Sequence, residues 1–270
     1  MNNNAVVVLD GEDEKIAVGP GIAFNKKRND IVIADKIEKI FVMNENMKFQ
    51  QLVSRIPEEH FTISEEIITY AEKTLGTKLN EHIHIALTDH VSLAIERTKD
   101  GIHLNNKLLH EIKILYRKEF EIGLWAVNYI NEKCQIEMIE DEAAYIAIHI
   151  HTMKPQAEGL HETLRQTAII KDMVQSIQRY LGITIEEEDI HYHRLITHLR
   201  FTLSRIYNFE VHTMDEEMLL MIKNKFPVSF SCAARVAKEL NETHHIEFPE
   251  QELGYIALHV ERLRKNFETT

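Results

Sequence analysis

The chain has 270 residues, of which 44% are hydrophobic and 27% charged, as in globular proteins of about two domains. No apolar run of about 18 residues could span a membrane, and the first residues lack the regions of a secretory signal. Two cysteines, Cys134 and Cys232, exclude a disulfide framework and predict a cytoplasmic location. The net charge of −12 excludes broad nonspecific nucleic-acid binding but leaves room for a small local site.

Residues 1–55 predict a small antiparallel β-sheet. Basic and acidic side chains balance in this segment, so the whole net charge falls in residues 56–270, and a domain boundary is expected near residue 55. A sheet of this size is marginal alone and would gain stability by dimerising. Short apolar runs at residues 5–9, 15–18, 22–24, 31–33 and 37–42 are the expected strands, with Gly19-Pro20-Gly21 as a turn or bulge.

From residue 56 the periodicity becomes helical and stays so to the end of the chain. Ser64 precedes a run of helix formers, which predicts that it caps the N-terminus of a helix. Loops are expected at residues 100–101, 153–159, 181–182 and 241–249.

An internal repeat is the strongest pattern in this helical part. Residues 142–150 (EAAYIAIHI) recur 110 positions later as residues 252–260 (ELGYIALHV). Residues 87–90 (LTDH), followed by Arg97, similarly match residues 195–198 (LITH), followed by Arg205. The repeat predicts two homologous all-helical bundle domains, at residues 60–165 and 166–270.

Each repeat carries two histidines at matching positions. A single histidine on an apolar helix face is usually a packed side chain, but repetition weakens that interpretation here. A neutral imidazole can accept a phosphoryl group from a phosphohistidine or phosphocysteine donor, and the product carries about two negative charges. The candidate phosphorylation sites are His90, His149, His198 and His259.

Two arginines are candidates to pair with such a phosphoryl group. Arg97 and Arg205 each follow a repeated histidine, His90 and His198, by about two helical turns and share its helix face. A surface salt bridge is an equally good interpretation of either arginine.

Metal binding is a weaker interpretation of the histidines. Pairs such as His82/His84 and His149/His151 are two residues apart and point to different sides of a helix, and neither HExxH nor CxxC occurs. The motifs GxxxxGK[ST], GxGxxG and GxSxG are absent as well. The sequence therefore predicts no enzymatic activity, no metal and no cofactor.

Three motifs in order resemble a known family. Residues 19–27 (GPGIAFNKK), residues 79–90 (LNEHIHIALTDH) and the two Tyr-Ile-Ala-x-His motifs together resemble the BglG/SacY family of bacterial transcriptional antiterminators, over essentially the whole chain. The resemblance implies that residues 1–55 are a dimeric co-antiterminator (CAT) RNA-binding domain. It implies that residues 60–165 and 166–270 are two phosphotransferase-system regulation domains (PRDs).

The resemblance also implies a function. The protein would bind a nascent mRNA hairpin that overlaps a terminator, so that transcription of a sugar-utilisation operon continues. A sugar-specific permease component would phosphorylate the first PRD and inactivate the protein, whereas the phosphocarrier protein would phosphorylate the second PRD and activate it.

Five residues fall on the RNA-contact motif of the family. An aromatic ring can stack on an unpaired base, an amide can read a base edge and lysine can neutralise phosphate. The arginine that the family has after the first glycine is Pro20 here, and Phe24 could instead be a core residue. The residues implied are Asn4, Gly19, Phe24, Lys26 and Lys27.

One departure leaves an alternative open. Family members usually have about six residues of strand before the asparagine turn, whereas this sequence begins Met1-Asn2-Asn3-Asn4, so the first strand is expected to be missing. The alternative function is a phosphorylation-responsive protein–protein regulatory module that has lost RNA binding. A DNA-binding activator would need a helix-turn-helix before residue 60, and the sequence has no such pattern.

Overall fold

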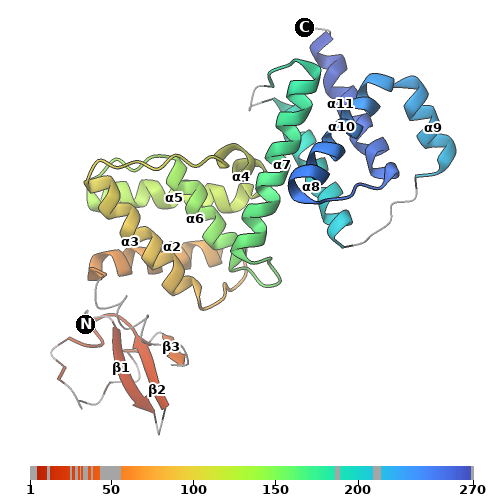
Figure 1. Cartoon of the computed structure of the whole chain (residues 1–270). Coiled ribbons are helices and arrows are strands. Elements are labelled where there is room, and N and C mark those ends of the chain that lie inside the picture. Colours follow the sequence, from red (N-terminus) through yellow and green to blue (C-terminus); the bar gives the residue numbers. More distant parts are fainter. Residues whose placement is uncertain are drawn as a thin grey trace. The chain divides into compact units, whose positions relative to one another are not determined.

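The computed structural model describes residues 5–10, 13–24, 26–27, 30, 32, 36–37, 39–42, 56–185, 189–208 and 214–268. A small antiparallel sheet precedes two all-helical bundles (Figure 1), as the sequence predicts. Two compact units divide the chain: residues 1–106 with 118–157, and residues 107–117 with 158–270. Over the described residues, the helices lack the length and apolar character needed to cross a membrane.

The sheet has three strands in the order β1 (Ala5–Asp10), β2 (Asp13–Val18) and β3 (Lys39–Val42). Both pairings are antiparallel, and the register joins Asp10 to Asp13 and Val18 to Lys39. The buried side chains of Ala17, Val18 and Ile22 anchor the end of β2 and the segment that follows it. The expected absence of a first strand concerns the start of the chain, and residues 1–4 lie outside the described residues.

The segment after β2 is a turn and not the strand that its apolar residues suggest. The amide of Ile22 donates to the carbonyl of Gly19 (3.2 Å), and that of Phe24 donates to Gly21 (3.1 Å). Gly21 has φ +61°, a conformation that glycine adopts without steric cost. This turn buries Ile22 and leaves the ring of Phe24 61% exposed, so the prediction of a strand at residues 22–24 and the core interpretation of Phe24 were wrong.

The first helical bundle begins with α2 (Glu58–Leu75), which packs against α3 (Ile83–Lys99). Ser64 lies inside α2, where its buried hydroxyl donates to the carbonyl of His60 (2.8 Å). The prediction that Ser64 is an N-cap was therefore wrong, because α2 begins two turns earlier with Glu58 and Glu59 in its first turn, where acidic side chains stabilise the helix dipole.

Helices α5 (Arg117–Cys134) and α6 (Asp141–Thr152) complete the first bundle. Alanines and isoleucines of α6 are buried on nearly every side of the helix, which marks it as a central helix. A Cβ atom on Gly123 would lie 2.2 Å from the carbonyl oxygen of Ala143. Glycine therefore allows the close approach of α5 to α6.

The second bundle contains α7 (Leu160–Leu181), α8 (Ile190–Tyr207), α9 (Glu216–Lys225), α10 (Pro227–His244) and α11 (Glu250–Glu268). Helix α10 packs on both α7 and α11, and α8 packs on α7 and α11. The short helix α4 (Leu109–Leu115) belongs to this unit and contacts α7 and α8. Helix α10 extends to His244, so the loop before α11 begins later than the expected residue 241.

The repeat appears in the backbone as well as in the sequence. Tyr116 ends α4 with φ −125° and ψ 44°, and its counterpart Phe226 ends α9 with φ −128° and ψ 56°. Gly76 and Gly182 end α2 and α7 in the left-handed conformation, which is a common helix termination. The two halves therefore share the order of their helices and the backbone conformation at these helix ends.

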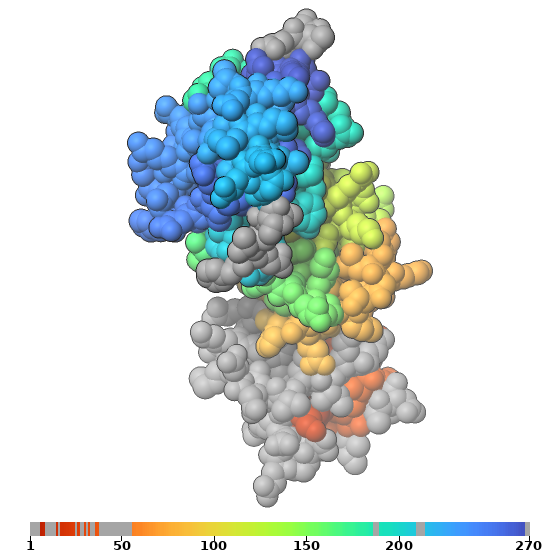
Figure 2. All heavy atoms as spheres, turned by 90° about the vertical axis from the view of Figure 1, so that its right-hand side faces the viewer, coloured from red at the N-terminus to blue at the C-terminus, as the bar shows by residue number. Residues whose placement is uncertain are grey.

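Helix α9 lies on the outside of the second unit, where Figure 2 draws it in light blue across the face toward the viewer. Three of its apolar side chains are exposed: Met218, Leu220 and Met221. Val228, at the start of α10, is exposed too. Several large apolar side chains exposed along one short stretch of chain favour a protein–protein contact there.

Candidate functional site

The first histidine site lies between α3 and α6, which pack against each other. His90 and Arg97 come from α3, and Glu142 and His149 come from α6. Nε2 of His90 lies 3.2 Å from Oε2 of Glu142, and Nη2 of Arg97 lies 3.0 Å from Oε1 of the same carboxylate. The rings of His90 and His149 are 5.0 Å apart, so the structure brings together both histidines and the arginine that the sequence singled out.

Burial governs the charges at this first site. Burial lowers the pKa of His149 to about 4, and the nearby His90 acts in the same direction. Burial alone would raise the pKa of Glu142, but the contacts from His90 and Arg97 outweigh it, so this pKa lies below its usual value. At neutral pH the site therefore holds an uncharged His149 beside an ionised Glu142.

The second histidine site repeats this arrangement between α8 and α11. His198 and Arg205 come from α8, and Glu252 and His259 come from α11. Arg205 binds Glu252 with two contacts, Nε to Oε1 at 2.9 Å and Nη2 to Oε2 at 2.6 Å. The rings of His198 and His259 stack with their centroids 3.7 Å apart, so here the first histidine contacts the second histidine.

Cations surround the second pair of histidines. Burial lowers the pKa of His259 to about 4, with His198, Arg262 and Arg205 acting in the same direction. Burial, Arg262 and Arg205 also lower the pKa of His198. Both imidazoles are therefore uncharged at neutral pH, and each keeps a nitrogen lone pair that can attack phosphorus.

The sequence interpretation missed the two glutamates. Glu142 and Glu252 open the repeated motif, and both are almost fully buried against the arginine that follows the first histidine of their repeat. Arg97 and Arg205 thus pair with buried glutamates, so the surface salt bridge of the sequence interpretation is in fact an ion pair to a buried carboxylate. The signal was present in the sequence, because glutamate and arginine recur with the same offsets as the histidines.

Two other histidines of the metal-like pairs take part in structural contacts. Nδ1 of His84 lies 2.5 Å from Oε1 of Glu65. Nδ1 of His151 lies 3.0 Å from Oε1 of the buried Glu119, which also binds Lys154 at 2.5 Å. Across the ranges given above, three or more histidine, cysteine or acidic side chains do not gather into a metal-binding group.

The turn after β2 collects most of the residues implied to contact RNA. Gly19 is buried and accepts the hydrogen bond that closes the turn, whereas Phe24, Lys26 and Lys27 are exposed. The amide of Lys27 donates to the carboxylate of Asp30 (2.8 Å), which orders the chain after the turn. Asn4 lies outside the described residues. Pro20 is exposed and offers no amide donor at this position.

Comparison with protein families divides the chain in the same way. The CAT RNA binding domain matches residues 1–50, and the PRD domain matches twice, at residues 65–153 and 171–263. The transcription antiterminator LicT of Bacillus subtilis (strain 168) is 34% identical over 98% of this chain and 97% of its own length.

The chain belongs to the BglG/SacY family of transcription antiterminators. The beta-glucoside operon antiterminator of Dickeya chrysanthemi is 32% identical over 99% of this chain and 96% of that protein. The GlcA/glcB genes antiterminator of Staphylococcus carnosus is 30% identical over 99% of this chain and 95% of that protein. The crystal structure of GlcT CAT-PRDI superimposes with a TM-score of 0.51 at 33% identity, covering 58% of this chain and 95% of that one.

Family membership assigns a role to each part of the molecule. The sheet with its exposed turn is the CAT RNA-binding domain, and the two helical repeats are PRDs, the domains through which the phosphotransferase system controls the protein. The first histidine site lies in the first PRD and the second site in the second PRD. The chain is thus a regulatory RNA-binding protein, as the sequence predicts.

Proposed function

We propose that this antiterminator is switched by phosphorylation of His90, His149, His198 and His259. The observation that carries the proposal is the duplication of one site: two histidines, an arginine and a buried glutamate are brought together twice by matching helices. Packing alone does not require two half-buried histidines in each domain, since an apolar side chain would cost less to bury.

Phosphoryl transfer from a phosphohistidine of the donor protein to one of these histidines needs no third reactant. The unprotonated ring nitrogen of the acceptor histidine attacks phosphorus and forms a new P–N bond. The P–N bond to the donor histidine breaks, and its electron pair returns to the donor ring. Each ring keeps the proton on its other nitrogen, so the positive charge passes from donor ring to acceptor ring together with the phosphoryl group.

The two PRDs have different roles in this proposal. The sugar-specific permease component phosphorylates the first PRD when sugar is absent and inactivates the protein, whereas the phosphocarrier protein phosphorylates the second PRD and activates it. A phosphoryl group on His90 would stand beside the ionised Glu142 and compete with it for Arg97. Arg97 and Arg205 would thus pair with phosphate after releasing their glutamates.

The CAT domain would act on an mRNA hairpin that overlaps a terminator of a sugar-utilisation operon. The exposed ring of Phe24 and the ammonium groups of Lys26 and Lys27 suit a single-stranded loop, in which unpaired bases stack on aromatic side chains. Asn4 and Gly19 would complete the contact. The exposed α9 residues favour a homodimer, and the protein would act in the cytoplasm without enzymatic activity.

The domain boundaries in this proposal are residues 1–55 for the CAT domain and residues 60–165 and 166–270 for the PRDs. The segment 107–117 falls within the first PRD in sequence and within the second compact unit in space. Helix α4 of this segment matches α9 of the second repeat, so the two repeats share an element order but place this short helix differently.

Hairpin binding tests the RNA function. In a gel-shift titration of the full chain at fixed salt, Phe24→Ala should weaken binding to a family-type antiterminator hairpin by about 5- to 100-fold, because one stacked base is lost. Fold is checked by circular dichroism, since an exposed side chain contributes little to stability. Unchanged affinity of Phe24→Ala would remove Phe24 from the interface. Absence of binding by the parent chain, also after an upstream strand is added, would favour the protein–protein module.

Operon reporters test the division of roles. His90→Ala should relieve inhibition by the permease component, and His198→Ala with His259→Ala should abolish activation by the phosphocarrier protein. Unchanged sugar control in the first variant would contradict the role of the first PRD. Full activity of the double variant in the second PRD would contradict the activating role of that domain.

A further inference from the structure

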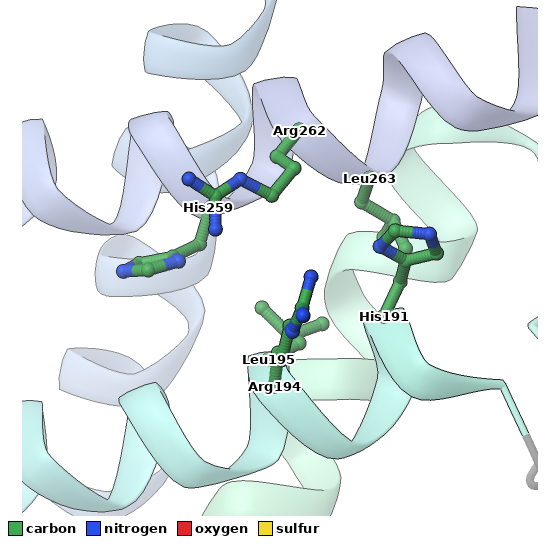
Figure 3. Close-up of a pocket in the computed structure, with 6 residues that line it drawn as sticks. All are labelled: His191, Arg194, Leu195, His259, Arg262 and Leu263. Atoms are coloured by element: carbon green, nitrogen blue, oxygen red, sulfur yellow. The ribbon is translucent and has the colours of Figure 1, made fainter.

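A small surface pocket adjoins the second histidine site on the side away from Glu252. Figure 3 shows that its walls come from two helices, with the side chains of Arg194 and Arg262 pointing into the space between α8 and α11. The guanidinium of Arg262 reaches back along α11 toward His259, and Arg194 rises from α8 to face it. The six lining residues are His191, Arg194, Leu195, His259, Arg262 and Leu263.

The two arginines of this pocket are available to a ligand. Both are exposed, and neither forms an ion pair within the part of the chain that the structure describes. They differ in this from Arg205, whose charge is balanced by the two contacts with Glu252. The pocket therefore presents two guanidinium groups without an ion-pair partner beside a half-buried, neutral histidine.

The first PRD has no counterpart of these cations. The repeat aligns Arg194 with Ala86 and Arg262 with Thr152. The hydroxyl of Thr152 donates to the carbonyl oxygens of Ile148 (2.9 Å) and His149 (3.2 Å), so it is engaged by its own helix. The two arginines of the pocket are therefore specific to the second site and are not part of the repeat.

We propose that Arg194 and Arg262 bind the phosphoryl group carried by His259, clamping α8 to α11 through that group. The inference rests on the proposed function of His259 as a phosphoacceptor. A phosphoryl group offers about two negative charges and three acceptor oxygens, and guanidinium groups bind such oxygens in pairs. By holding negative charge on the oxygens, the two arginines would also slow loss of the phosphoryl group, since that charge expels the ring nitrogen.

The test follows the lifetime of one phosphohistidine. In the full chain with His90, His149 and His198 changed to alanine, His259 is phosphorylated with phosphoramidate, and decay at mildly alkaline pH is followed by mass spectrometry of the peptide that contains His259. Arg194→Ala and Arg262→Thr, the residues of the first PRD, should together shorten the lifetime about 10-fold, as expected for losing charge-assisted hydrogen bonds. The lifetime in Arg262→Lys should lie between those of the parent and the Arg262→Thr variant, because lysine keeps the positive charge and loses the paired N–H donors of the guanidinium group.

Arg235→Ala is the control, because this exposed arginine of α10 pairs with Glu239 and its loss changes the net charge as much as either pocket substitution does alone. Equal lifetimes in the pocket variants and the control would overturn the pocket and leave the phosphoacceptor role of His259 standing. Absence of any label on His259 would overturn both. Saturable binding of inorganic phosphate to the unphosphorylated chain, with unchanged lifetimes, would assign the pocket to a free anion and overturn the covalent assignment.

Discussion

The first and second histidine sites contain the same residue types at the same repeat positions, yet their charges are arranged differently. In the first site His90 faces the buried carboxylate of Glu142. In the second site Arg205 occupies both oxygens of Glu252, and His198 stacks on His259. A phosphoryl group added to the first site meets a negative charge, whereas one added to the second site meets arginines.

This difference gives a physical reason for opposite responses to one modification. A new dianion beside a buried carboxylate destabilises the α3–α6 contact or takes Arg97 from it. A new dianion between Arg194 and Arg262 adds charge-assisted hydrogen bonds. In the proposed function, changes in a few charged residues of a repeated domain would therefore be sufficient to give an inhibitory site and an activating site.

Substituting the buried glutamate should give the largest difference in stability between the two sites. Glu252→Gln removes the charge that holds both donor groups of Arg205 and should cost about 3 kcal/mol of unfolding free energy, as for breaking a buried pair. Glu142→Gln disturbs one contact of the more exposed Arg97 and should cost about 1–2 kcal/mol. Urea unfolding followed by circular dichroism measures both costs, because its signal comes from the helices of both bundles, and the fluorescence of the single tryptophan, Trp125 on α5, isolates the first bundle. An equal or larger cost at Glu142 would contradict the ranking.

Replacing the glycines at close helix contacts should give the next largest difference in stability between the two bundles. Gly123→Ala would press a methyl group against the backbone of α6 at Ala143 and should cost about 1–3 kcal/mol, as overpacking does. In the second bundle a methyl group on Gly254 would meet the side chain of Met214 at 2.7 Å, which can move aside, and alanine favours the helix. Gly254→Ala should therefore be nearly neutral in thermal unfolding. A cost above that of Gly123→Ala would show that Met214 is fixed.

Lowering the pH should reduce the folding stability contributed by both sites to a similar extent, and by less than the substitutions above. The pKa values of His149 and His259 are lowered to about 4 in the folded chain, below the usual 6.5 of an unfolded histidine. The unfolded chain then binds more protons, so their contribution to stability is complete above pH 6.5 and is lost progressively as the pH falls toward 4.

Melting temperatures between pH 7 and pH 5 measure this effect. His149→Gln and His259→Gln should each reduce the pH dependence by a similar amount. His103→Gln, at an exposed position of the first unit, is the control and should leave it unchanged. A reduction in one site alone would show that the two histidines are not equivalently buried.

Sequence reasoning found the elements that repeat and missed those that depend on packing between distant segments. The two homologous helical domains and their paired histidines followed from periodicity and the offset of 110 residues, and the basic turn followed from composition and the family resemblance. Ser64 was misread as a cap because hydroxyl side chains suit helix starts and also back-bond inside helices. Residues 22–24 were misread as a strand because three consecutive apolar residues suit a strand equally well, and the positive φ of Gly21 that makes the turn is not visible in the sequence.

The partners of the arginines could not be predicted in the same way. Glu142 stands in the first turn of α6, where an acidic residue is expected for the helix dipole alone. Its contact with Arg97 spans 45 residues and depends on how α3 packs on α6. The pocket beside His259 likewise needs α8 and α11 side by side, which periodicity does not specify.

Calorimetry of the phosphorylated chain tests the central claim most directly. Two full-length double variants each remove one of the two sites: His198→Ala with His259→Ala leaves the first site, and His90→Ala with His149→Ala leaves the second. After treatment with phosphoramidate, the first of these proteins should melt at a lower temperature than before and the second at a higher one. Shifts of the same sign in both proteins would contradict the account, because the surrounding charges would then not decide the response.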